Sequence, residues 1–93
     1  MKSYFLEGTG DIADVRGALS ALLPGQADPW LLHAAVDDVL AYLDVTANET
    51  GAWSIQADVS GRHYDCDNMV LNVLRKLQTQ LGGLVRDDDG NDR

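Results

Sequence analysis

The stretch from Asp67 to Gly83 constrains the fold most, because it predicts an amphipathic helix with defined ends. Asp67 is a typical N-cap residue, since a carboxylate accepts the free N–H groups of a first helical turn. Gly82 and Gly83 predict the end of the helix, because glycine adopts positive φ angles without steric penalty. Apolar residues recur between these ends at helical spacing, and the rest of the chain must bury this stripe. The stripe consists of Val70, Val73, Leu74, Leu77 and Leu81.

Three further elements are predicted upstream. Residues 2–6 (KSYFL) read as a short strand that the glycines of the GTGD turn interrupt. Residues 11–23 read as a helix with Thr9 or Asp11 as its cap, and Pro24-Gly25 ends it. A second helix is predicted over residues 28–44, because Asp28 is a good cap and Pro29 suits the first helical position. Its apolar stripe is Leu32, Ala35, Val36, Val39, Leu40 and Leu43.

Residues 53–60 alternate strictly between apolar and polar side chains, which predicts a half-buried strand. Ser60-Gly61 then fits a two-residue hairpin turn, with residues 62–66 as the return strand. Two short strands, 45–48 and 84–86, remain optional. The expected fold class is α+β, in the order β-α-α-β-β-α, with an antiparallel sheet packed on helices. Residues 1–86 are expected to form one domain and residues 87–93 an acidic, solvated tail.

The chain of 93 residues carries 15 acidic and 7 basic residues, for a net charge of −8. The last seven residues carry −3 of this charge, so residues 1–86 are acidic as well. A negative surface repels phosphate, which argues against direct binding of nucleic acid or an anionic membrane and favours a basic protein partner. A single cysteine and no apolar leader or membrane-spanning run fit a cytoplasmic protein.

The polar face of the expected hairpin is the first candidate for chemistry. Asp58, His63, Asp65 and Asp67 would converge there, and an imidazole with carboxylates suits a divalent metal or acid–base catalysis. A solvated polar face explains the same residues without any ligand. Cys66 falls on the opposite face of the strand from His63, so we interpret it as a small core residue and not a nucleophile. The DDDGND tail does not fit an EF-hand loop. The sequence also has no zinc ligand set, no Gly-rich phosphate loop and no diagnostic Ser-His-Asp spacing, so we predict no metal, no cofactor and no enzyme.

In size, charge and fold class the chain resembles small bacterial or phage inhibitors, such as toxin-immunity proteins, nuclease inhibitors and anti-defence proteins. These proteins use carboxylates to occupy the basic groove of an enzyme that handles nucleic acid. No family motif carries this resemblance, so it transfers no residue roles. It implies a protein-binding function, for which exposed acidic clusters are the candidate partner-binding residues. These are Asp37, Asp38 and Asp44 on the expected second helix and Asp58, Asp65 and Asp67 on the expected hairpin.

Two alternatives remain open. A homo-oligomeric regulatory or structural domain would pair through the sheet and use Trp30, Trp53 and Tyr64 as anchors. A small-ligand or metal-binding domain would use the polar face of the hairpin. The three hypotheses predict, respectively, a salt-sensitive complex, a dimer largely indifferent to salt, and a ligand-dependent melting temperature.

Overall fold

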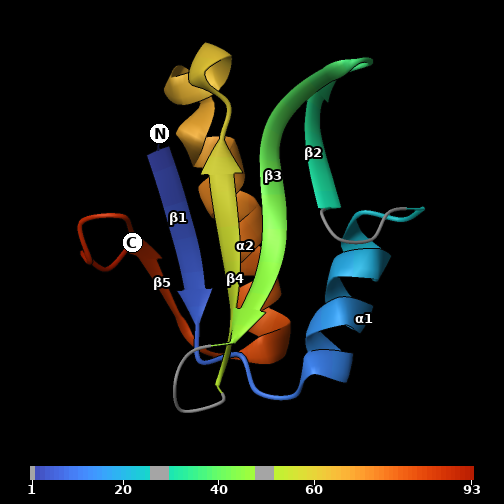
Figure 1. The fold of residues 1–93 in the computed structure, drawn as a ribbon, viewed down its shortest axis with the longest axis vertical. Coiled ribbons are helices and arrows are strands. Elements are labelled where there is room, and N and C mark those ends of the chain that lie inside the picture. The colour runs from blue at the N-terminus through green and yellow to red at the C-terminus, as the bar shows by residue number, and fades with distance from the viewer. Residues whose placement is uncertain (1, 26–29, 48–51) are drawn as a thin grey trace.

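A computed structural model describes residues 2–25, 30–47 and 52–93. Within these residues the chain forms an antiparallel five-stranded sheet and two α-helices, which confirms the α+β class. The strands lie side by side in the order β2-β3-β4-β1-β5 (Figure 1). The elements are β1 (Lys2–Glu7), α1 (Ile12–Leu22), β2 (Trp30–Ala35), β3 (Asp38–Ala47), β4 (Trp53–Val59), the 3₁₀ segment η1 (Gly61–Cys66), α2 (Asp67–Leu81) and β5 (Leu84–Asp87).

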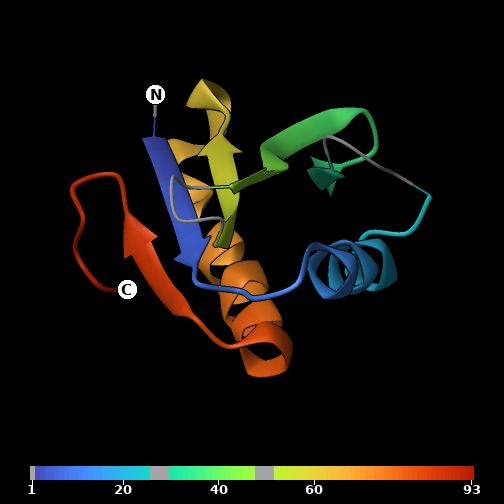
Figure 2. The ribbon, with the colours of Figure 1, turned by 60° about the horizontal axis from the view of Figure 1, so that its bottom comes forward.

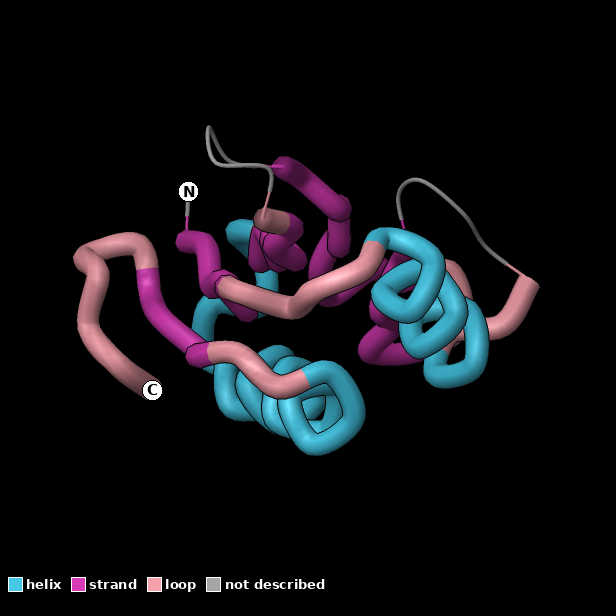
Figure 3. Tube along the Cα trace, turned by 90° about the horizontal axis from the view of Figure 1, so that it is seen from below, coloured by secondary structure: helices cyan, strands magenta, loops and turns pink. Residues whose placement is uncertain are grey.

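Both helices lie on one side of the sheet and leave the other side open (Figures 2 and 3). Helix α2 contacts β1, β4 and β5, and α1 lies beside α2 toward the β2 edge. Alternate residues of the central strands point into this layer, as the period of two requires. The buried set includes Leu6, Ile55 and Leu43 from the strands, Leu19 from α1, and Leu74 from α2.

Most predicted elements are confirmed. Strand β1, helix α1 and strand β4 occupy the expected ranges, and the carboxylate of Asp11 caps α1 by accepting from the backbone N–H of Ala13. Helix α2 begins at Asp67, although Cys66 and not Asp67 occupies the cap position. The optional strand at 84–86 is β5, and residues 45–47 form the end of β3, while Asn48 lies outside the described residues. Residues 88–93 are exposed, whereas Asp87 is buried and belongs to β5.

The predicted second helix is wrong within the described residues 30–44. These residues form the antiparallel hairpin β2–β3, which turns at Val36 and Asp37. Asp37 takes a φ angle of 60°, a left-handed conformation that aspartate tolerates better than most side chains. The expected cap and first position, Asp28 and Pro29, lie outside the described residues.

The predicted return strand at 62–66 is also wrong. Strand β4 is hydrogen-bonded to β3 on one side and to β1 on the other, so neither edge remains for a third strand. The chain instead turns through η1 directly into α2. The predicted element order is therefore replaced by β-α-β-β-β-α-β, with η1 before the second helix.

Candidate functional site

The six predicted partner-binding residues lie in three separate places. Asp37 and Asp38 are at the β2–β3 turn, and Asp44 and Asp58 are in the interiors of β3 and β4. Asp65 and Asp67 are at the junction of η1 with α2. The strands bring Asp44 and Asp58 together, although the sequence had assigned them to different clusters.

At the β2–β3 turn, Asp37 is exposed, whereas the Asp38 carboxylate lies 2.9 Å from Nε2 of His63. This contact joins the hairpin to η1. The expected convergence of His63 with Asp58 on one hairpin face is therefore wrong, because η1 carries His63 toward the start of β3. The hairpin face that would have gathered a metal or an acid–base pair does not form.

The open face of the sheet holds the second pair of acids. Strand register places Asp58 of β4 directly between Tyr42 of β3 and Ser3 of β1, and it places Asp44 opposite Gln56. The Asp58 carboxylate accepts hydrogen bonds from Ser3 Oγ at 2.7 Å and from Gln56 Nε2 at 3.0 Å. Both donors are neutral, so they hold the carboxylate in position without cancelling its charge. We call Tyr42, Asp44 and Asp58 the open-face triad.

Asp44 has no ion pair or side-chain hydrogen bond with the residues that the structure describes, and Tyr42 is 44% exposed beside it. No Lys or Arg occurs between Arg16 and Arg62, a stretch with six acidic residues that includes β2, β3 and β4. Strands β2, β3 and β4 therefore carry acidic residues but no Lys or Arg. The absence of Lys and Arg between Arg16 and Arg62 is visible in the sequence, and it is the signal that could have grouped Asp44 with Asp58.

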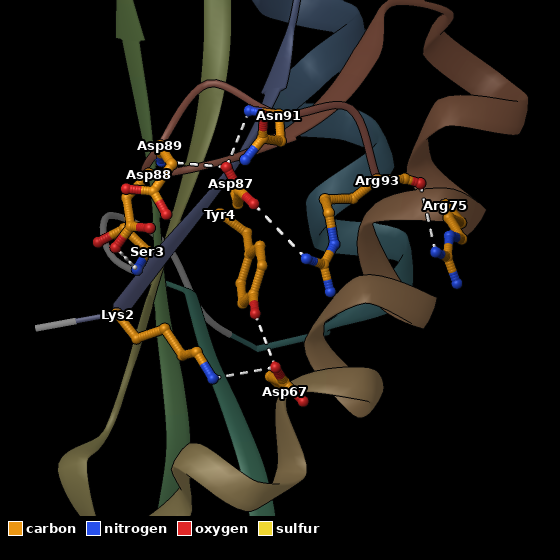
Figure 4. Close-up of polar contacts among 10 residues, drawn as sticks. All are labelled: Lys2, Ser3, Tyr4, Asp67, Arg75, Asp87, Asp88, Asp89, Asn91 and Arg93. Atoms are coloured by element: carbon orange, nitrogen blue, oxygen red, sulfur yellow. Dashed lines mark hydrogen bonds and ion pairs between the residues drawn. The ribbon is translucent and has the colours of Figure 1, made fainter.

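Asp67 is bound within the domain at the start of α2 (Figure 4). Its Oδ2 accepts from the Tyr4 hydroxyl at 2.7 Å and from Lys2 Nζ at 3.1 Å. These hydrogen bonds lower the pKa of the Asp67 carboxyl, chiefly through Tyr4. Burial, followed by the bond to Asp67, raises the pKa of Tyr4. The contact links β1 to α2, so it stabilises the fold, while neighbouring Asp65 is exposed on η1.

A third acidic group, Asp87, Asp88 and Asp89, has carboxylate oxygens close enough for a cation. Its geometry is explained within the chain, because Asp87 Oδ1 accepts from the backbone N–H groups of Asp89 and Asn91 (Figure 4). These N–H groups lower the pKa of Asp87, and the Arg93 guanidinium lies 3.5 Å from its Oδ2. The group is part of the turn that folds the C-terminal residues back along β5.

The expected dimer anchors are mostly covered. Trp30 is 1% exposed and belongs to the core, and Trp53 is half-buried. Tyr64 is exposed, with Lys2 Nζ 5.8 Å from its ring centre. Cys66 is half-buried against the core, as its interpretation as a packing residue requires.

An open groove of about 420 Å³ lies between α1 and the end of α2. Its walls include Ala13, Gly17 and Ala21 of α1 and Leu81 of α2. The Thr9 hydroxyl at its edge already donates to the carbonyl oxygen of Trp53 at 2.9 Å. The groove is thus lined largely by small side chains.

Comparisons of the chain with protein-family models, with curated proteins and with solved structures found no match. Among the described residues, neither α1 nor α2 is long and apolar enough to cross a membrane.

Proposed function

We propose that this protein is a non-enzymatic binding domain whose acidic open face binds a basic protein partner. An enzyme that handles nucleic acid is the partner class with the most suitable surface, because its substrate groove is positively charged. Occupation of that groove by carboxylates would inhibit the enzyme, as an immunity or anti-defence protein does. The proposed setting is the cytoplasm of a bacterium or of a phage-infected cell.

One observation carries this proposal: the sheet face that the helices leave open has acidic residues around an exposed aromatic ring. Asp44 and Asp58 flank Tyr42 there, and strands β2, β3 and β4 contain no Lys or Arg. Complementary charge accelerates association and selects against acidic partners. An aromatic side chain supplies contact area at the centre of such an interface. The homo-oligomer alternative has less support, since Trp30 is buried.

The test begins with capture of partners from a lysate of the source organism at about 50 mM salt, followed by affinity measurement with the purified partner. The variant Asp44→Lys/Asp58→Lys is expected to bind at least about 100-fold more weakly, because close interfacial charge pairs are coupled by about 1.5 kcal/mol or more each. The matched control is Asp14→Lys/Asp89→Lys, which changes the net charge equally at exposed positions on α1 and in the C-terminal turn.

The control variant is expected to keep most of the affinity, and the wild-type complex is expected to weaken steeply at about 200 mM salt. Equal losses in the two variants would mean that only net charge matters. An unchanged affinity in Asp44→Lys/Asp58→Lys would remove the open face from the proposal altogether.

A further inference from the structure

We infer that the open-face triad receives one arginine side chain of the partner, with the guanidinium stacked on the Tyr42 ring between the two carboxylates. This inference rests on the proposed function and identifies the chemical group that the open face recognises. It starts from the strand register, which fixes how the three side chains are spaced.

The register makes a compact triangle of one ring and two acids. Tyr42 and Asp58 are directly opposite on neighbouring strands, so their Cβ atoms are about 5 Å apart. Asp44 follows Tyr42 by two residues on the same face, which is about 7 Å along the strand. Asp44 and Asp58 are diagonal neighbours, about 7–8 Å apart. A cation over the ring is therefore within reach of both carboxylates.

The surroundings of the other tyrosines support this use of Tyr42. The chain contains three tyrosines, and two of them have a cation of the chain itself near the ring. Lys2 Nζ lies 5.8 Å from the Tyr64 ring centre, and the Arg93 guanidinium carbon lies 5.9 Å from that of Tyr4. Tyr42 has no such cation among the described residues, although it is the tyrosine with two carboxylates beside it on an open face.

The geometry favours arginine over lysine. A planar guanidinium stacks on a ring and offers five N–H donors, so it can bond to both acids while it covers the aromatic face. Ser3 and Gln56 hold Asp58 on the open face, which reduces the ordering that binding would require. A lysine ammonium makes the same charge contact but not the stacked arrangement.

The first experiment uses hexa-arginine and hexa-lysine peptides as probes, titrated into the ¹⁵N-labelled protein and followed by NMR. Hexa-arginine is expected to bind more tightly and to shift the amides of residues 42, 44 and 58. Tyr42→Leu is expected to weaken hexa-arginine binding about 2- to 5-fold, the range of an exposed cation–π contact, whereas Tyr42→Phe keeps the affinity. The control Tyr64→Leu removes a ring elsewhere and is expected to have no effect.

Equal binding of hexa-arginine to wild type and Tyr42→Leu would overturn the inference, as would shifts confined to residues 87–89. The captured partner separates this failure from that of the proposed function. If Asp44→Lys/Asp58→Lys abolishes partner binding while Tyr42→Leu keeps it fully, the arginine position is wrong and the acidic interface stands. If the partner binds both variants like wild type, the proposed function itself fails at this face.

Discussion

Gly83 is the position at which a single methyl group is expected to disturb the fold most. It joins α2 to β5 with a φ angle of 91°, and a Cβ there would overlap the backbone oxygen of Glu7. Glu7 is the last residue of β1 and pairs with Leu84, so its carbonyl group cannot move without disturbing the β1–β5 pairing. Gly83→Ala therefore combines backbone strain with a steric clash.

The adjacent Gly82 provides a matched control. Its φ angle is also positive, at 75°, but a Cβ there would meet no atom within 4 Å. A non-glycine residue in such a conformation costs about 1–3 kcal/mol, so we expect Gly82→Ala to lose about 2 kcal/mol of the free energy of unfolding. Overpacking adds about 1–3 kcal/mol, which brings Gly83→Ala to about 4 kcal/mol.

Urea denaturation and thermal unfolding of both variants, each followed by circular dichroism, measure the difference. We expect unchanged slopes and a melting temperature roughly 10 °C lower for Gly83→Ala than for Gly82→Ala, because 1 kcal/mol corresponds to about 4–8 °C in a domain of this size. Failure of Gly83→Ala to fold, with Gly82→Ala folded, agrees with the same reasoning. Equal losses in the two variants would refute the close approach of Gly83 to β1.

Two further predictions test the polar contacts and the hairpin. Tyr4→Phe removes the main cause of the lowered pKa of Asp67. A lowered folded-state pKa stabilises the protein above the ordinary carboxyl pKa, and this contribution is lost as the pH falls through the lowered value. We expect Tyr4→Phe to lower the free energy of unfolding by about 1–2 kcal/mol at pH 7 and by less near pH 2. NMR titration of the variant is expected to show a higher pKa of Asp67. Equal losses of stability at both pH values would contradict the stabilising role of the Tyr4–Asp67 hydrogen bond. Asp37→Gly should raise the free energy of unfolding by about 0.5 kcal/mol, because glycine accepts the φ of 60° without strain. In a helix the same change would lower the free energy of unfolding by about 0.3 kcal/mol, the difference between the helix propensities of aspartate and glycine. Urea denaturation gives the sign, and a loss of stability would contradict the turn.

The sequence predicted the secondary structure correctly where a single hydrophobic period, helical or alternating, dominates a segment. The stripe of α2 and the alternation in β4 each predict one secondary structure, and both elements formed as expected. The α+β class followed from them. The partners of β4 did not follow, because the pairing with β1 and β3 is long-range and depends on elements distant in the sequence.

The hairpin β2–β3 was missed for an identifiable reason. Its register shifts between Leu32 and His33, so that Leu40 is an extra residue in β3 and both Leu40 and Ala41 are buried. Two adjacent buried residues interrupt the alternation of a strand and imitate the spacing of a helical stripe. The alternation is intact only from Ala41 onward, where Tyr42, Asp44 and Thr46 face away from the core. Because Asp44 belongs to this segment, the error in secondary structure also placed it in a different predicted cluster from Asp58 of β4.

The distribution of charge separates the acids that stabilise the fold from those proposed to bind a partner. Lys2, Arg86 and Arg93 each lie within ion-pair distance of a carboxylate on the β1–β5 side of the domain. Asp44 and Asp58 have no such cation among the described residues, and the register places these two like charges as diagonal neighbours on adjacent strands. Asparagine at these two positions removes the charge and keeps an acceptor oxygen for Ser3 and Gln56, so it should leave the free domain about equally stable, whereas removal of the Asp67 charge should weaken it. Residues that contribute to binding and not to stability are expected to show this relation, so the comparison distinguishes the open face from the start of α2 as the interface.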